Sequence, residues 1–64
     1  MSAKWSVVKC IKVVSALEDL AGISRVREHV KALLRVVDEI CGDYYLEYPQ
    51  LMDTVSRLRI SLKS

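Results

Sequence analysis

Apolar residues recur every three or four positions along almost the whole chain, and few structures other than helices satisfy that spacing. The first stripe consists of Val7, Cys10, Val14, Leu17 and Ala21. Side chains spaced in this way share one face of an α-helix, and the lysines and acids of the segment take the opposite face. The pattern therefore predicts a helix over residues 3–20.

A short turn signal separates this helix from the next. Gly22 is predicted to follow the last helical turn in a left-handed conformation, which glycine adopts without a steric cost. Ser24 is a favourable N-cap for a second helix over residues 25–41, and Gly42 ends that helix in the same way as Gly22 ends the first. The apolar stripe of the second helix consists of Val26, Val30, Leu33, Val37 and Ile40, with Leu34 and Cys41 beside it.

A third helix is predicted over residues 49–62. Pro49 suits its first turn, where the missing N–H is harmless. Its stripe consists of Leu51, Val55, Leu58 and Leu62. Three helices without a flexible linker predict one all-α domain over residues 1–64. We expect a small three-helix protein, with an antiparallel helix hairpin plus a third helix, packed as a homo-oligomer.

A second interpretation joins the first two helices into one. A heptad phase continues through Gly22, so a single long coiled-coil helix is also consistent with the pattern. The order of charges favours the hairpin, because both segments carry bases early and acids late, against the helix dipole. Folding back at Gly22 would bring Lys4 and Lys9 near Asp38 and Glu39.

The composition argues against several functions. In 64 residues there is little room for an enzyme pocket, and His29 is the only histidine. We therefore predict no enzyme activity, no metal site, no cofactor and no small-molecule substrate. A net charge of +2 is too small to establish a nucleic-acid partner.

The two cysteines and the apolar segments bear on location. Cys10 and Cys41 both fall on apolar stripes, so we expect small core residues; a Cys10–Cys41 bridge or a redox pair is the alternative. No apolar stretch resembles a secretory signal or approaches the roughly 20 residues that span a bilayer. We expect no membrane association and a cytoplasmic location.

The chain carries more apolar residues than three core stripes require, since 52% of it is hydrophobic. A helical wheel leaves several of them outside the stripes, and aromatic residues of this kind favour interfaces. We predict an interaction surface from Trp5, Val8, Val36, Tyr44, Tyr45, Tyr48 and Ile60. The alternative is that the connector between the second and third helices, residues 43–48 with all three tyrosines, folds back and caps the bundle. The first hypothesis for function is thus an interaction or oligomerisation module that binds a second copy, as a homodimer, or another protein.

The second hypothesis is nucleic-acid binding. The segment Leu20-Ala21-Gly22-Ile23-Ser24-Arg25 resembles the turn of helix-turn-helix DNA-binding domains, and residues 26–34 are similar to recognition helices of winged-helix repressors. Glu18 and Glu28 stand where those families have a small and an aliphatic residue. The resemblance implies a second helix that enters the major groove. The residues that it places against DNA are Ser24, Arg25, Arg27, Glu28 and Lys31.

Overall fold

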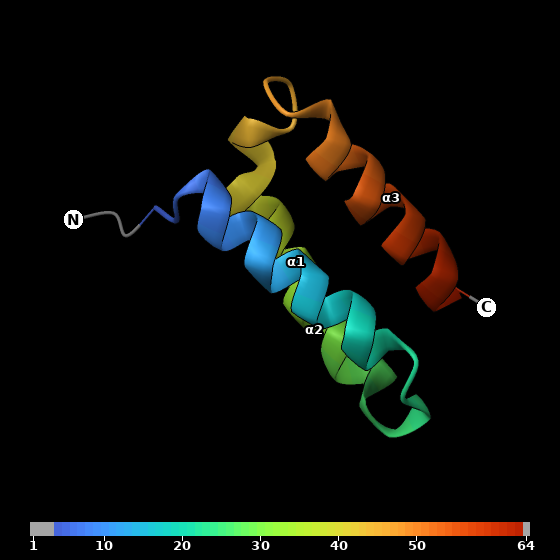
Figure 1. Cartoon of the computed structure of the whole chain (residues 1–64). Helices are drawn as coiled ribbons and strands as arrows, with labels where there is room; N and C mark the ends of the chain where they lie inside the picture. The colour runs from blue at the N-terminus through green and yellow to red at the C-terminus, as the bar shows by residue number, and fades with distance from the viewer. Residues whose placement is uncertain (1–3, 64) are drawn as a thin grey trace.

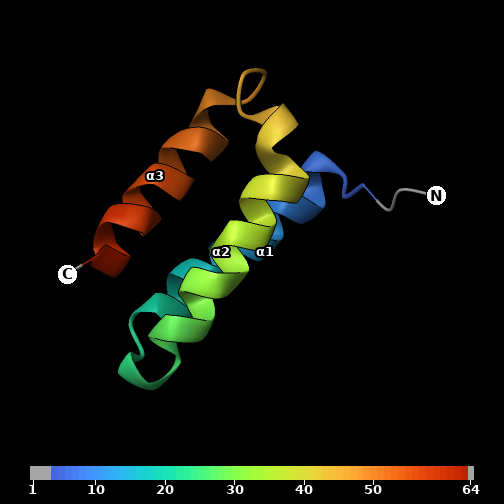
Figure 2. The ribbon, with the colours of Figure 1, turned by 180° about the vertical axis from the view of Figure 1, so that it is seen from behind.

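Three helices make up the computed structural model, which describes residues 4–63. They are α1 (Val7–Ala21), α2 (Arg27–Cys41) and α3 (Pro49–Lys63). Helices α1 and α2 lie side by side and run in opposite directions, while α3 runs back along one side of this hairpin (Figure 1). The view from behind shows the same arrangement (Figure 2). The structure confirms the all-α, three-helix prediction with its antiparallel hairpin.

Helix α1 begins later than the predicted residue 3, which lies outside the described residues. Ser6 is extended, with φ −71° and ψ 161°, and its hydroxyl accepts a hydrogen bond from the Lys9 amide at 3.2 Å. This side-chain cap satisfies one of the free amides of the first turn, so the helix begins at Val7. The ends of α2 and the whole of α3 agree with the predicted ranges to within two residues.

The left-handed conformation predicted for the two glycines is wrong. Gly22 has φ −76° and ψ −10°, and Gly42 has φ −56° and ψ −34°, both right-handed. A short 3₁₀ turn over Ser24–Val26 follows Gly22, and Gly42 itself begins a second one over Gly42–Tyr44, so neither glycine's conformational freedom is used. Ser24 belongs to the first of these turns and does not cap α2, which follows Val26 without a side-chain cap.

The break between Ala21 and Arg27 also rules out one continuous helix. The chain reverses there through backbone hydrogen bonds from Ile23 N to the Leu20 carbonyl at 2.9 Å and from Val26 N to the Ile23 carbonyl at 3.1 Å. The first bond satisfies a carbonyl group of the last turn of α1, and the second closes the short turn before α2.

The core contains residues from all three helices. Its buried members are Cys10, Val14, Leu17, Val30, Leu34, Val37, Cys41, Leu51, Val55, Leu58 and Leu62. They match the predicted stripes on α1 and α3. On α2 the buried face is rotated toward Leu34 and Cys41, and Leu33 is exposed, because α3 packs against the Leu34 side of the helix.

A disulfide joins Cys10 and Cys41, whose Cα atoms are 6.2 Å apart. Both residues are fully buried, so the predicted core positions are confirmed. Their thiols are not free, however, because the alternative, a Cys10–Cys41 bridge, is present. It fastens the first turn of α1 to the last residue of α2, and α3 is held to this hairpin by packing and polar contacts.

Candidate functional site

The structure distributes the seven residues predicted to form an interaction surface over all three helices and the segments that flank them. Val8, Val36 and Ile60 are exposed, but each lies on a different helix. Tyr48 precedes α3 and is exposed as well, beside a small cleft between α1 and α3. Trp5, Tyr44 and Tyr45 are partly buried against the core.

The aromatic residues close the end of the hairpin where α1 begins and α2 ends. The Tyr44 hydroxyl donates to the Trp5 carbonyl at 2.8 Å, and the rings of Tyr44 and Tyr48 meet edge to face at 6.1 Å. Lys4 Nζ lies 3.0 Å from Asp43 Oδ2 and 5.1 Å from the centre of the Tyr44 ring. The hydrogen bond and negative charge of Asp43 raise the pKa of Lys4. Tyr44 therefore caps this end of the bundle, as the alternative interpretation of the connector expects.

Lys4 was expected near Asp38 or Glu39, and this expectation is wrong. Asp38 binds elsewhere: Tyr45 donates its hydroxyl to Asp38 Oδ1 at 2.6 Å, and Arg59 Nη2 donates to Asp38 Oδ2. Burial, followed by the hydrogen bond to Asp38, raises the pKa of Tyr45 well above its ordinary value. Asp38 on α2 thus holds both the segment between α2 and α3, through Tyr45, and α3 itself, through Arg59. Tyr45 therefore stabilises the fold.

One face of the hairpin carries apolar residues that no helix within residues 4–63 covers. Helix α3 faces Asp38 on α2 and Glu18 on α1, because both residues line clefts against it. Residues two positions away on a helix lie about 160° round its axis. Val36 and Leu20, two positions from Asp38 and Glu18, therefore point away from α3, and they are 44% and 39% exposed.

These two residues belong to two parallel rows. On α2 the row has spacings of three and four, and so has the row on α1. The members are Leu33, Val36 and Ile40 on α2 and Val13, Ala16 and Leu20 on α1. Leu33 is 49% exposed, and Val13 and Ile40 are partly buried. We call these six residues the free hairpin face; in Figures 1 and 2, α3 lies on the other side of the hairpin.

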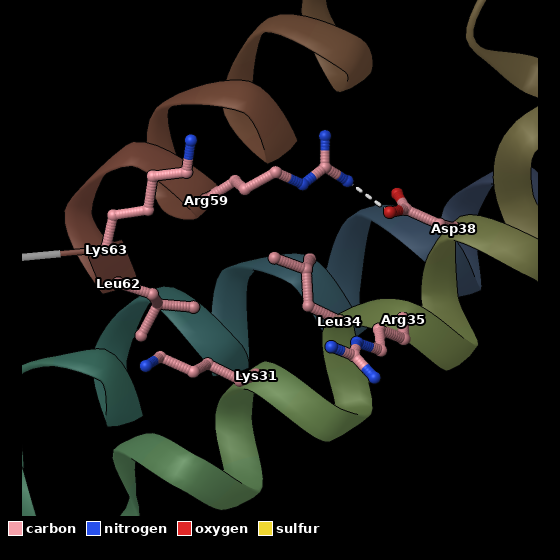
Figure 3. A pocket seen from close by; sticks show the side chains of 7 residues that line it. All are labelled: Lys31, Leu34, Arg35, Asp38, Arg59, Leu62 and Lys63. Atoms are coloured by element: carbon pink, nitrogen blue, oxygen red, sulfur yellow. Dashed lines mark hydrogen bonds and ion pairs between the residues drawn. The ribbon is translucent and has the colours of Figure 1, made fainter.

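A second feature is a cleft of about 380 Å³ between α2 and α3 (Figure 3). It is lined by Lys31, Leu34, Arg35, Asp38, Arg59, Leu62 and Lys63, and we call it the cationic cleft. Arg59 reaches across to Asp38 at one end, and Lys31 and Lys63 lie at the other. Leu34 lies between the two ends, and Leu62 lies beside Lys31 and Lys63.

Sequence analysis missed the cationic cleft, although a signal for it exists. Lys31 and Arg35 are four residues apart on α2, as Arg59 and Lys63 are on α3, so each pair shares one helix face. The sequence does not tell that these two faces meet.

The structure places the predicted nucleic-acid residues at the start of α2, where Arg27 and Lys31 are turned toward α3. Ser24 and Arg25 are exposed in the turn before α2, and Glu28 pairs with Lys31 at 3.3 Å. Arg27 is partly buried, and its Nη2 donates to the Ser61 carbonyl of α3 at 2.9 Å. Lys31 lines the cationic cleft.

Within residues 4–63 no three side chains of His, Cys, Asp or Glu gather to hold a metal ion. Over the same range, none of the helices has both the length and the apolar character needed to cross a membrane. Comparison of the chain with family models, with curated protein sequences and with solved structures gave no match.

Proposed function

We propose that this protein is a small oligomerisation module in which a second copy of the chain docks on the free hairpin face. The observation that supports it is the pair of apolar rows turned away from α3. A helix normally buries such a row against a neighbour, and this chain has no fourth helix among its described residues. Two hairpins that pack face to face through these rows would form a four-helix bundle.

Charges beside the face favour a second copy over an unrelated partner. Lys12 and Asp19 lie seven residues apart, hence on one flank of α1, with the base toward its start and the acid toward its end. Neither forms an ion pair anywhere in residues 4–63. A two-fold axis perpendicular to the helices would set α1 antiparallel to α1 of the second copy, and each Lys12 would then face Asp19 of that copy.

The size of the face sets the expected affinity. Helices α1 and α2 have 15 residues each and so are about 22 Å long, and two helices are about 20 Å wide. The face therefore offers about 440 Å² per copy, or about 900 Å² in all, which lies below the roughly 1,200 Å² of standard stable interfaces. We expect a transient dimer with a dissociation constant in the micromolar range.

Sedimentation equilibrium over a dilution series tests the dimer. Leu33→Glu together with Val36→Glu should leave a monomer at all concentrations, because charged side chains would be buried without partners. Ile60→Glu is the matched control: Ile60 is 69% exposed on α3, outside the face, so its substitution should leave the dimer intact. A monomeric wild-type chain at millimolar concentration would refute the proposal, and so would a dimer broken only by Ile60→Glu.

A charge exchange tests the antiparallel arrangement. Asp19→Lys should weaken the dimer by placing Lys12 opposite a lysine, and adding Lys12→Glu should restore it. Seven residues separate the two positions within one chain, so restoration would have to arise between chains. If the double exchange does not restore the dimer, the antiparallel arrangement is rejected. The free hairpin face itself is tested separately by the Leu33→Glu and Val36→Glu variant.

The alternative function, DNA binding, stays a prediction. It expects binding to duplex DNA that weakens steeply with salt and is lost in Arg27→Glu with Lys31→Glu. The antiparallel packing of α1 and α2 does not favour it, because helix-turn-helix pairs cross at roughly 90–120°. No binding to a mixed-sequence duplex at low salt would reject it.

The cytoplasmic location is likewise an expectation, and the disulfide argues against it, because disulfides persist mainly in oxidising compartments. Alkylation of the thiols in freshly lysed cells would decide between the two. Extensive alkylation of Cys10 and Cys41 would support a reducing compartment, and protection of both would support an oxidising one.

A further inference from the structure

We propose that the cationic cleft between α2 and α3 binds a small amphipathic anion, that is, a carboxylate or phosphate group on a short apolar body. This ligand site is separate from the free hairpin face. It also departs from the expectation that so short a chain has no room for a small molecule.

The charge of the cleft points to an anion. Its lining contains four cations and one carboxylate, Asp38, which Arg59 already engages. Lys31 pairs with Glu28, an exposed residue of the preceding turn. Arg35 and Lys63 form no ion pair within residues 4–63. Because they approach one cleft from two helices, their repulsion is relieved when an anion lies between them.

The apolar floor of the cleft favours a ligand with an apolar body. Leu34 on α2 and Leu62 on α3 are buried core residues that also line it, so a ligand can reach the edge of the core between the two helices. The volume of about 380 Å³ lies within the range of small-molecule pockets. A simple inorganic anion would leave the leucine surface in contact with water, whereas an alkyl group would cover it.

One end of the cleft is positioned in advance. Asp38 accepts hydrogen bonds from both Tyr45 and Arg59, which holds the guanidinium between the helices. A guanidinium has five N–H donors in a fixed fork, so Arg59 keeps donors for a ligand while it binds Asp38. The head group is thus expected beside Arg35 and Arg59, with the apolar body over Leu34 and Leu62 toward the Lys31 and Lys63 end.

Titration followed by amide NMR shifts tests the site. The probes are octanoate and octyl phosphate. The controls are octanol, which has the apolar body without a charge, and inorganic phosphate, which has the charge without an apolar body. Both amphipathic anions should shift the amides of residues 31–38 and 59–63, and the stronger binder of the two identifies the preferred head group. Octanol and inorganic phosphate should each bind at least about tenfold more weakly, because each lacks one of the two matched parts.

Charge-reversal variants locate the binding. Arg35→Glu should weaken octanoate binding about tenfold or more, since it replaces a cation beside the head group, and Lys63→Glu should weaken it less, since Lys63 lies at the other end of the cleft. Arg57→Glu is the matched control, with the same change of charge on the same helix and outside the cleft lining. Amide spectra of the free variants report whether each is folded. Shifts confined to the free hairpin face, equal binding of octanol, or equal weakening by Arg57→Glu would overturn the proposal.

Discussion

Reduction of the Cys10–Cys41 disulfide should destabilise this protein more than any single substitution on its surface. The bond closes a loop with a sequence separation of 31 residues. In the chain-entropy treatment, a loop of this length restricts the unfolded chain by about 3.7 kcal/mol at room temperature. A chain of 64 residues has a total unfolding free energy of roughly 3–10 kcal/mol, so the loss would be a large share of it.

Urea unfolding of the oxidised and reduced protein, followed by the helix signal in circular dichroism, measures this loss. The reduced form is prepared by unfolding and refolding in a phosphine reductant, because the buried sulfur atoms are shielded from it in the folded state. With a denaturant slope of about 1 kcal/mol per molar urea, the midpoint should fall by roughly 3–4 M, or the reduced chain should be unfolded in water. Protein concentration is kept equal, since dimerisation would also stabilise the fold.

Both forms retain the two sulfur atoms, so the comparison isolates the covalent link from the packing of the side chains. A reduced protein within about 1 kcal/mol of the oxidised one would refute the reasoning. It would mean that the unfolded chain already keeps the two cysteines close, or that packing alone holds α1 against α2.

Three further predictions concern the backbone, the core and pH. Gly42→Ala should raise the unfolding free energy by about 0.4–1 kcal/mol in urea, because Gly42 is right-handed and an added Cβ would meet no atom within 4 Å; a loss of stability would contradict the observed backbone. Leu58→Ala, in the buried face of α3, should cost about 2–5 kcal/mol, whereas the exposed Met52→Ala should cost less than about 1 kcal/mol; equal losses would contradict the packing. The unfolded chain loses the Tyr45 proton near pH 10 while the folded chain keeps it, so the unfolding free energy should fall as pH rises above about 10. Tyr45→Phe should flatten that fall when unfolding is measured at several pH values. An unchanged slope would contradict the raised pKa of Tyr45.

Sequence reasoning predicted the helices well because their apolar spacing is local information. It predicted less well how the helices rotate against one another. Leu33 was placed in the core and Leu34 beside it, and the reverse holds, since the position of α3 decides which side of α2 is buried. A helical wheel describes the faces of one helix. Which of those faces another helix covers depends on the fold of the whole chain.

The candidate sites show the same limit. Tyr44 and Tyr45 look like surplus surface residues until their hydroxyls meet the Trp5 carbonyl and Asp38, which lie 39 and 7 residues away along the chain. The basic residues of α2 and α3 look like two separate solvated faces, and the fold joins them into one cleft. Val36 was predicted to be exposed at an interface, and its exposure agrees with that prediction.

The single disulfide divides the fold into two parts of different mechanical strength. It locks α1 to α2, while α3 is attached to them by side-chain packing, the Arg59–Asp38 pair and the Arg27 hydrogen bond to Ser61. In native-state hydrogen exchange, the amides of α3 should therefore open at a lower free energy than those of the hairpin, as a separate cooperative unit. A ligand in the cationic cleft would contact α2 and α3 together, so its binding would be read out as slower exchange along α3.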